Sequence, residues 1–140
     1  VLVILLLGVV IGAIAGYYGG VVDSLLARLA DIFYAVPLIL GAILLLQAGP
    51  QTGLPIISER GPGAVALALA FFGWMTAMRL VRSQVIAVKS GDYVAAARAM
   101  GASDVRIMLR HILPNAVAPV LVYTTITIGV LIAAEATLTF

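Results

Sequence analysis

Few residues of this chain could do chemistry, and none of them stands in a recognisable catalytic set. Val88-Lys89-Ser90 resembles the end of a phosphate-binding loop, G-x-x-x-x-G-K-[ST], in which glycine N–H groups hold the phosphates. The glycine positions are taken by Ser83 and Val88, so the match fails. His111 is the only histidine and has no acidic or serine partner at a motif spacing, and Glu135 is interpreted as a membrane-interface residue. We therefore expect no catalytic residue, no metal site and no cofactor bound by this chain.

The composition indicates a membrane protein. The chain has 140 residues, of which 64% are hydrophobic and 10% charged, and its mean hydropathy is +1.21. A soluble domain carries roughly 25% charged residues, so most of this surface must face a bilayer rather than water. The absence of cysteine excludes a disulfide or thiolate metal site, and the net charge of +2 gives no reason to expect a nucleic-acid partner.

Four apolar stretches are candidates for membrane-spanning helices, since a span needs roughly 20 residues of helix. They cover about 1–18, 32–48, 64–78 and 116–134. A polar break over Tyr17–Asp31, in which Arg28 and Asp31 can pair, separates the first two, and Pro37 is expected to kink the second. Gly49–Gly63 reads as a loop. The helical pattern of the third span continues to Lys89.

A ladder of glycines follows the first span. Gly8, Gly12, Gly16 and Gly20 recur every four residues and are expected to line one stripe of the helix, where small residues let another helix approach closely. We favour packing against a helix of the same chain over a homodimer interface.

The basic residues predict the orientation. One side holds Arg28 and the region between the third and fourth spans, with Arg79, Arg82, Lys89, Arg98, Arg106 and Arg110; the other side holds only Arg60. An excess of Lys and Arg marks the cytoplasmic side. The loop over about 79–115 is therefore expected in the cytoplasm. A start within an apolar stretch also leads us to expect a fragment that lacks its first and last spans.

The segment Ser90–Asn115 is expected to form two short helices joined at a glycine. Asp92 is a candidate N-cap of the first helix, and Gly101 a left-handed residue that ends it. Ser103 or Asp104 would cap the second helix, and Pro114 would stop it.

The second short helix is predicted to be two-faced. Its apolar positions follow the i, i+3, i+4, i+7 spacing of one face: Val105, Met108, Leu109 and Ile112. Arg106 and Arg110 lie one turn apart on the other side. Such a helix can rest on the membrane protein with one face and present the other to a partner.

This segment resembles the cytoplasmic loop of the permease subunits of binding-protein-dependent ABC importers. That loop has the consensus E-A-A, three residues, G, nine residues, I-x-L-P. Here the same spacing holds Ala95-Ala96-Ala97, then Gly101, then His111-Ile112-Leu113-Pro114. The flanks resemble the dipeptide, oligopeptide and nickel branch, as do AGYYGGVVDSLLARLADIFYAVP and AEATLTF, so the resemblance covers essentially the whole chain.

The resemblance implies an all-α, polytopic helix bundle, the transmembrane domain of a type I ABC importer in the inner membrane. It implies a second permease subunit, an extracytoplasmic substrate-binding protein and cytoplasmic subunits that bind and hydrolyse ATP, whereas this chain is not an enzyme. The loop would couple the ATPase to the spans. The residues expected to do so are Asp92, Ala95, Ala96, Ala97, Arg98, Gly101, Ser103, Asp104, Arg106, Leu113 and Pro114.

Two departures bear on that docking: Ala95 replaces the motif glutamate and His111 replaces the motif isoleucine. Asp92 or Asp104 would stand in for the lost acid, unless the partner lacks the matching base.

Two other classes of protein stay open. One is a structural subunit whose basic loop lies on lipid head groups, and the other is a secondary transporter with broken or ionisable helices near mid-membrane. The substrate, whether dipeptide, oligopeptide or nickel, is left undecided.

Overall fold

The computed structural model describes residues 1–52 and 62–139, and within these ranges the chain forms helices and no strand. This confirms the prediction of an all-α chain. The helical segments are α1 (Leu2–Tyr18), α2 (Gly20–Tyr34), α3 (Leu38–Thr52), α5 (Pro62–Lys89), α6 (Asp92–Ala99), α7 (Asp104–Ile107), the π-helical turn η1 (Met108–Ile112) and α8 (Leu113–Thr139).

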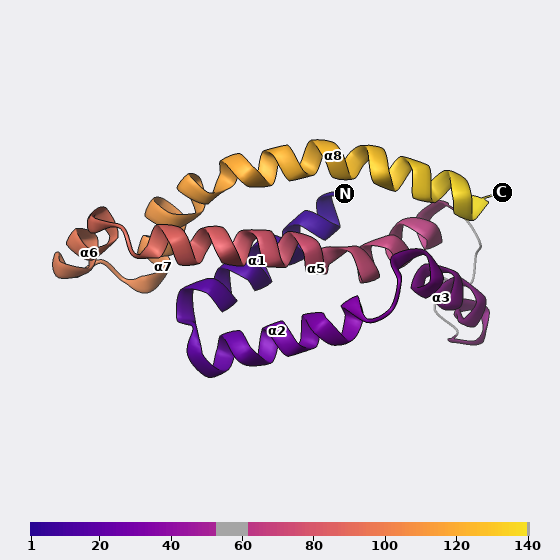
Figure 1. Ribbon diagram of the computed structural model, residues 1–140, viewed down its shortest axis with the longest axis horizontal. Coiled ribbons are helices and arrows are strands. Elements are labelled where there is room, and N and C mark those ends of the chain that lie inside the picture. Colours follow the sequence, from indigo (N-terminus) through magenta and orange to yellow (C-terminus); the bar gives the residue numbers. More distant parts are fainter. Residues whose placement is uncertain (53–61, 140) are drawn as a thin grey trace.

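The helices form an elongated bundle (Figure 1). Helices α1 and α5 lie together at its centre, α8 runs along one side and α2 along the other. Helix α3 lies at one end of the bundle. At the opposite end, α6 and α7 project beyond the ends of α1 and α2. The predicted loop over Gly49–Gly63 falls largely outside the described residues, although α3 continues to Thr52 and α5 begins at Pro62.

The seam between α1 and α5 is built on three of the four predicted glycines. A Cβ atom added at Gly12 would lie 2.5 Å from the Met78 carbonyl oxygen, and one added at Gly16 would lie 2.8 Å from the Arg82 carbonyl oxygen. Gly8 meets α5 one turn earlier, at Ala77. The two backbones are thus close enough to exclude any side chain, and the glycine stripe faces a helix of the same chain.

Gly20 does not belong to this stripe, and the prediction for it is wrong. Helix α1 ends at Tyr18, and Gly19 and Gly20 both have positive φ, at 68° and 54°. These left-handed residues reverse the chain into α2, so the four-residue period stops at Gly16. No atom lies within 4 Å of a Cβ added at Gly20.

The predicted polar break over Tyr17–Asp31 is also wrong beyond that turn, because α2 occupies most of it. Its acids pair with α5 rather than with Arg28: Asp31 accepts from Arg79, and both carboxylate oxygens of Asp23 accept from Arg82. The second bond to Asp23, from Arg82 Nη2 to Oδ2, measures 2.5 Å. The two acids of α2 therefore lie on the face turned to α5 and do not interrupt the helix.

The second predicted span is divided into two helices. Helix α2 ends at Tyr34, α3 begins at Leu38, and their axes differ by 79°. Pro37 accounts for the break, because it has no N–H to donate and disfavours helical geometry at the residue before it. The predicted bend at Pro37 is therefore present, but it is a full break between two helices and not a kink within one.

Among the described residues, two helical stretches are long and apolar enough to cross a membrane, Gly63–Lys89 and Pro119–Leu138. The bent pair α2–α3 adds a third if it counts as one span, and α1 is apolar but has 17 residues. As predicted, the helix of the third span runs on to Lys89.

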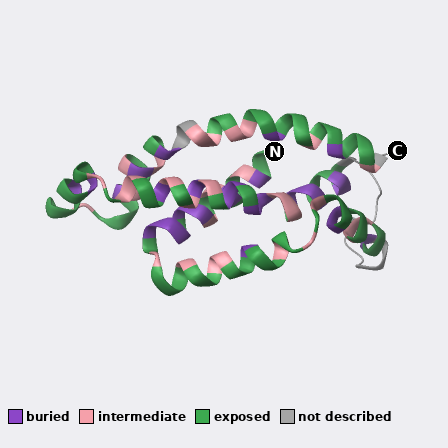
Figure 2. Ribbon diagram, in the orientation of Figure 1, coloured by how far each residue is buried: buried purple, intermediate pink, exposed green. Residues whose placement is uncertain are grey.

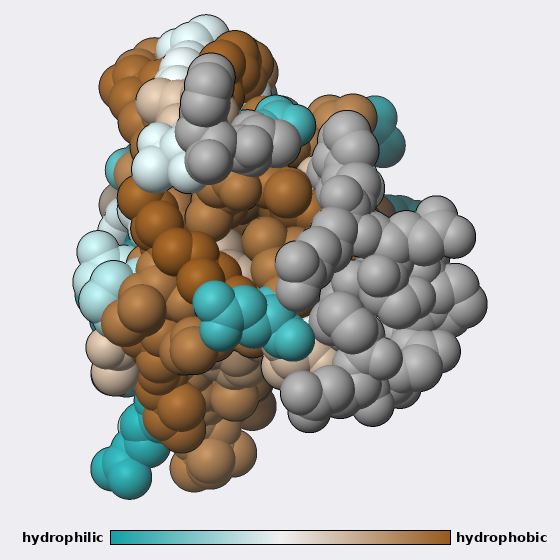
Figure 3. Space-filling model, turned by 90° about the vertical axis from the view of Figure 1, so that its right-hand side faces the viewer, coloured by the Kyte–Doolittle hydropathy of each residue, from teal (hydrophilic) through white to brown (hydrophobic). Residues whose placement is uncertain are grey.

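Apolar side chains remain exposed over much of the bundle. Helix α8 is exposed along most of its length, whereas buried residues gather on α1 and α5 (Figure 2). Hydrophobic residues predominate among the described residues on the end-on face of the molecule (Figure 3). Such a surface suits lipid or further membrane helices rather than water.

The α1–α5 seam predicts a clear effect of adding one methyl group. In the full-length protein, Gly12→Ala should lower the free energy of unfolding by about 1–3 kcal/mol, because its Cβ meets rigid backbone. Denaturant titration in mild detergent measures it. Gly129→Ala on α8 is the matched control, since its Cβ would meet open space. Equal stability of the two variants would contradict the close seam.

Candidate functional site

The projecting loop is fixed to the membrane helices by an apolar cluster. This cluster contains Ala13 and Tyr17 of α1, Val81 and Val85 of α5, Val94 and Ala97 of α6, Ile107 of α7 and Ile112 of η1. Five of these side chains are fully buried: Val81, Val85, Val94, Ile107 and Ile112. Both short helices of the loop therefore share one core with the ends of α1 and α5.

The turn between the two short helices is a complete Schellman motif. Gly101 has φ 80°, and its N–H donates to the Arg98 carbonyl at 3.0 Å. The N–H of Ala102 donates to the Ala97 carbonyl at 3.1 Å. These two bonds satisfy the free carbonyls at the end of α6. The prediction that Gly101 supplies a left-handed helix end is confirmed.

The caps differ in detail from the predictions. Gly91 is the N-cap of α6 and Asp92 is its first helical residue, so Asp92 as N-cap is wrong. Ser103 is the N-cap of α7, but its side chain makes no capping bond. The predicted stop at Pro114 is wrong too, because α8 begins at Leu113 and continues through it. The π-helical turn ahead of α8 widens the helix and leaves room for a proline ring.

The same π-helical turn changes which residues face the core. Ile107 and Ile112, five residues apart, are fully buried, whereas Val105 and Leu109 are 62% and 61% exposed. Five-residue spacing matches a π-helix and not the α-helical period used in the prediction. The predicted apolar face is therefore wrong for Val105 and Leu109, which point outward.

The alanine run of α6 is divided between two environments. Ala95 and Ala96 are exposed, whereas Ala97 is buried in the cluster beneath. Only the first two can meet a partner. Leu113 packs against the same cluster, and Pro114 is exposed.

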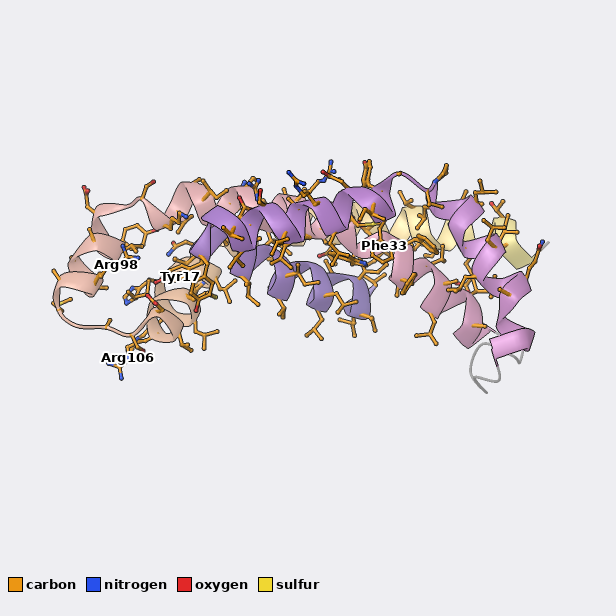
Figure 4. The ribbon with its side chains drawn as sticks, turned by 90° about the horizontal axis from the view of Figure 1, so that it is seen from below. Tyr17, Phe33, Arg98 and Arg106 are labelled. Atoms are coloured by element: carbon orange, nitrogen blue, oxygen red, sulfur yellow. The ribbon has the colours of Figure 1, made fainter. Side chains whose placement is uncertain are left out.

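Two predicted docking charges are bonded to the end of α1, although both residues remain exposed. Arg98 and Asp104 both bond to the hydroxyl of Tyr17, at the end of α1. The bond to Tyr17 raises the pKa of the Arg98 guanidinium, which stays charged. Arg106, in contrast, points away from the body of the molecule (Figure 4). Tyr17 was missed from the sequence, where the only signal is a hydroxyl at the end of an apolar helix.

A basic hollow of about 370 Å³ lies beside the exposed face of the loop. Its walls are Ala97, Met100 and Ala102 on one side and Arg106, Arg110 and His111 on the other. Neither arginine has an ion pair with any acid of the described residues. The loop thus presents cations next to the exposed apolar side chains of Met100, Val105 and Leu109.

A second hollow, of about 400 Å³, lies between the helices of the bundle. Its lining comes from α1, the α2–α3 break, α5 and α8, and it is apolar apart from hydroxyls of Tyr34, Thr76, Tyr123 and Thr127. Within residues 1–52 and 62–139, no three acidic, histidine or cysteine side chains gather as a metal site would require.

Together these features define a class: an α-helical membrane protein with a two-helix loop locked to its spans. The sequence pattern of the family described as binding-protein-dependent transport system inner membrane component matches residues 8–140. The chain belongs to that family, and the fold class and membrane location predicted from the sequence are confirmed.

Curated relatives support the same assignment. The chain is 37% identical over 136 residues to the oligopeptide transport system permease protein OppC of Bacillus subtilis, covering 97% of this chain and 42% of that protein. It is 36% identical to the dipeptide transport system permease protein DppC of the same organism, covering 96% and 39%. It is also 36% identical to the glutathione transport system permease protein GsiD of Pectobacterium atrosepticum, covering 100% and 44%. The chain thus spans about two fifths of the length of these relatives.

The loop turn predicts a specific cost for a side chain at residue 101. In the full-length protein, Gly101→Ala should lower the free energy of unfolding by about 1–2 kcal/mol, because an L-residue is strained at φ 80°. No atom lies within 4 Å, so the cost is one of backbone strain and not of crowding. Chemical denaturation measures it, with Gly63→Ala as control, since that Cβ also has open space. A cost no larger than that of the control would refute the left-handed turn.

Proposed function

We propose that this chain is part of the permease subunit of an ATP-driven peptide importer and that its loop docks onto a cytoplasmic ATPase subunit. The observation that carries the proposal is the outward, partly apolar face of a loop whose other face is locked into the α1–α5 core. ATP is bound and hydrolysed by the partner, and this chain transmits motion and performs no chemistry.

The exposed face has the chemistry of a protein interface. Met100, Val105 and Leu109 are 80%, 62% and 61% exposed on a loop that the distribution of basic residues places outside the lipid. Large apolar side chains next to arginines are typical of the centre of an interface rather than of a solvated loop. Arg106 and Arg110 have no acid of their own in the described part of the chain, and therefore suit carboxylates on the partner.

The alanine at position 95 fits this arrangement. Ala95 and Ala96 are exposed on α6 and give a flat surface without the motif's acid. Both candidate substitutes for that acid are exposed: Asp92 lies in the first turn of α6, and Asp104 also accepts from the Tyr17 hydroxyl. The docking charge of this loop is therefore mainly basic, and Asp92 and Asp104 are its exposed acids.

Peptides are the substrate class we propose. The relatives reported above are named for oligopeptide, dipeptide and glutathione transport. The hollow in the bundle, with four hydroxyl groups and otherwise apolar walls, suits a path for short peptides. A second permease subunit would complete the path, and an extracytoplasmic binding protein would deliver the substrate. Nickel is the alternative that the sequence left open.

Two other classes make different predictions. A lipid-lying structural subunit would turn the apolar side chains of its loop into the membrane, whereas this loop projects beyond the bundle (Figure 1). A secondary transporter predicts a broken membrane helix, and the 79° break between α2 and α3 is such a feature. Membership of the binding-protein-dependent family favours the importer over both.

The docking proposal predicts that acidic residues introduced on the exposed face of the loop weaken binding of the ATPase subunits. In the full-length complex, Val105→Asp with Leu109→Asp should reduce co-purification of the ATPase subunits about tenfold or more, because interface centres are desolvated. ATP-dependent uptake of a labelled dipeptide into vesicles should fall equally. Unlabelled oligopeptide, glutathione and nickel as competitors then identify the substrate.

Leu25→Asp is the matched control, because Leu25 is 63% exposed on α2 and far from the loop in sequence. It should leave co-purification unchanged while membrane insertion is followed for all variants. Retention of the ATPase by the double variant would exclude docking through this face. Absence of ATP-dependent peptide uptake by the wild type would overturn the importer proposal.

A further inference from the structure

Tyr17 joins the membrane bundle to both halves of the loop. Its ring is buried in the cluster shared by α1, α5, α6, α7 and η1. Its hydroxyl donates to Asp104 Oδ1 at 2.5 Å and accepts from Arg98 Nη2 at 3.4 Å. These partners lie 87 and 81 residues further along the chain.

The two partners stand on opposite sides of the Gly101 turn. Arg98 is in the last turn of α6 and Asp104 begins α7. A tyrosine hydroxyl is suited to both, because it can donate to a carboxylate and accept from a guanidinium at the same time. Figure 4 shows Arg98 and Tyr17 next to each other at the end of the molecule that carries the loop. One atom of α1 therefore bonds to both short helices, in addition to the apolar cluster that they share.

Lys89, the last residue of α5, bonds to the end of the α1 backbone. Its ammonium group donates to the carbonyl oxygens of Gly16 at 2.8 Å and Tyr17 at 3.3 Å. These are among the last carbonyls of α1, which have no partner within the helix and favour a cation. The end of α5 is thereby tied to the residue whose side chain holds the loop.

We propose that Tyr17 is a positioning residue that locks α6 and α7 to the end of α1, so that a displacement of the loop moves the membrane helix. The inference rests on the proposed function, in which ATPase subunits displace the loop. Tyr17 does not touch the ATPase or the substrate. Without its hydroxyl the ATPase still docks and hydrolyses ATP, but less of its motion reaches α1.

Tyr17→Phe tests this role, because phenylalanine keeps the buried ring and removes only the hydroxyl. Tyr18→Phe is the matched control on the neighbouring residue, whose ring is 55% exposed. In proteoliposomes with the complete transporter, Tyr17→Phe should raise the ATP consumed per peptide transported about threefold or more, with ATPase co-purification unchanged. Tyr18→Phe should match the wild type.

Two further variants separate positioning from general stability. Asp104→Asn keeps an acceptor for the Tyr17 hydroxyl and should retain near-normal coupling. Asp104→Ala removes the acceptor and should raise the ATP consumed per peptide, as Tyr17→Phe does. The double variant Tyr17→Phe with Asp104→Ala should be no worse than Tyr17→Phe alone, because Tyr17→Phe already removes the bond to Asp104.

Amide hydrogen exchange of residues 92–112 tests the lock without any transport. Tyr17→Phe should speed exchange there about threefold or more relative to Tyr18→Phe. Equal exchange and equal ATP per peptide in the two variants would overturn the lock. A wild type without ATP-dependent uptake would overturn the proposed function instead, and the exchange comparison would still decide on the lock.

Discussion

The close approach of α1 to α5 is the constraint on which the rest of the structure depends. Gly12 and Gly16 bring the α1 backbone against the carbonyls of Met78 and Arg82, at distances that no side chain would permit. That approach places the end of α1 beside the end of α5, where Lys89 reaches the last carbonyls of α1. The same approach places the Tyr17 ring at the foot of the loop.

The loop can be rigid because it is built from that base. Its buried residues, Val94, Ala97, Ile107 and Ile112, all pack into the cluster that α1 and α5 begin. Burial of one face leaves the opposite face of the loop, with Val105 and Leu109, free for a partner. A loop that transmits motion needs both properties, an exposed surface that a partner contacts and a rigid, packed core.

The sequence predicted local features well and long-range ones poorly. Gly101 was predictable because a left-handed residue between two short helices is a local property. Helix α2 was missed because Asp23 and Asp31 read as a break until their partners on α5, more than 40 residues away, are known. Ile107 and Ile112 are buried five residues apart because the segment between them is π-helical. The α-helical repeat used on the sequence could not predict the burial of Ile107. The bonds of Arg98 and Asp104 to the Tyr17 hydroxyl could not be predicted, because no motif marked Tyr17.

The most direct test of the central claim is a distance between the loop and the far end of α1. Ala96 on α6 and Val3 on α1 are both exposed, so each can be replaced by cysteine and carry a spin label. These 140 residues contain no other cysteine that would be labelled. The distance between the two spin labels should be measured by double electron–electron resonance in the complete transporter, once without nucleotide and once with a non-hydrolysable ATP analogue. A rigid lever predicts a change smaller than about 2 Å between the two states. A clear shift or broadening on nucleotide binding would show that the loop moves independently of α1 and would contradict the account.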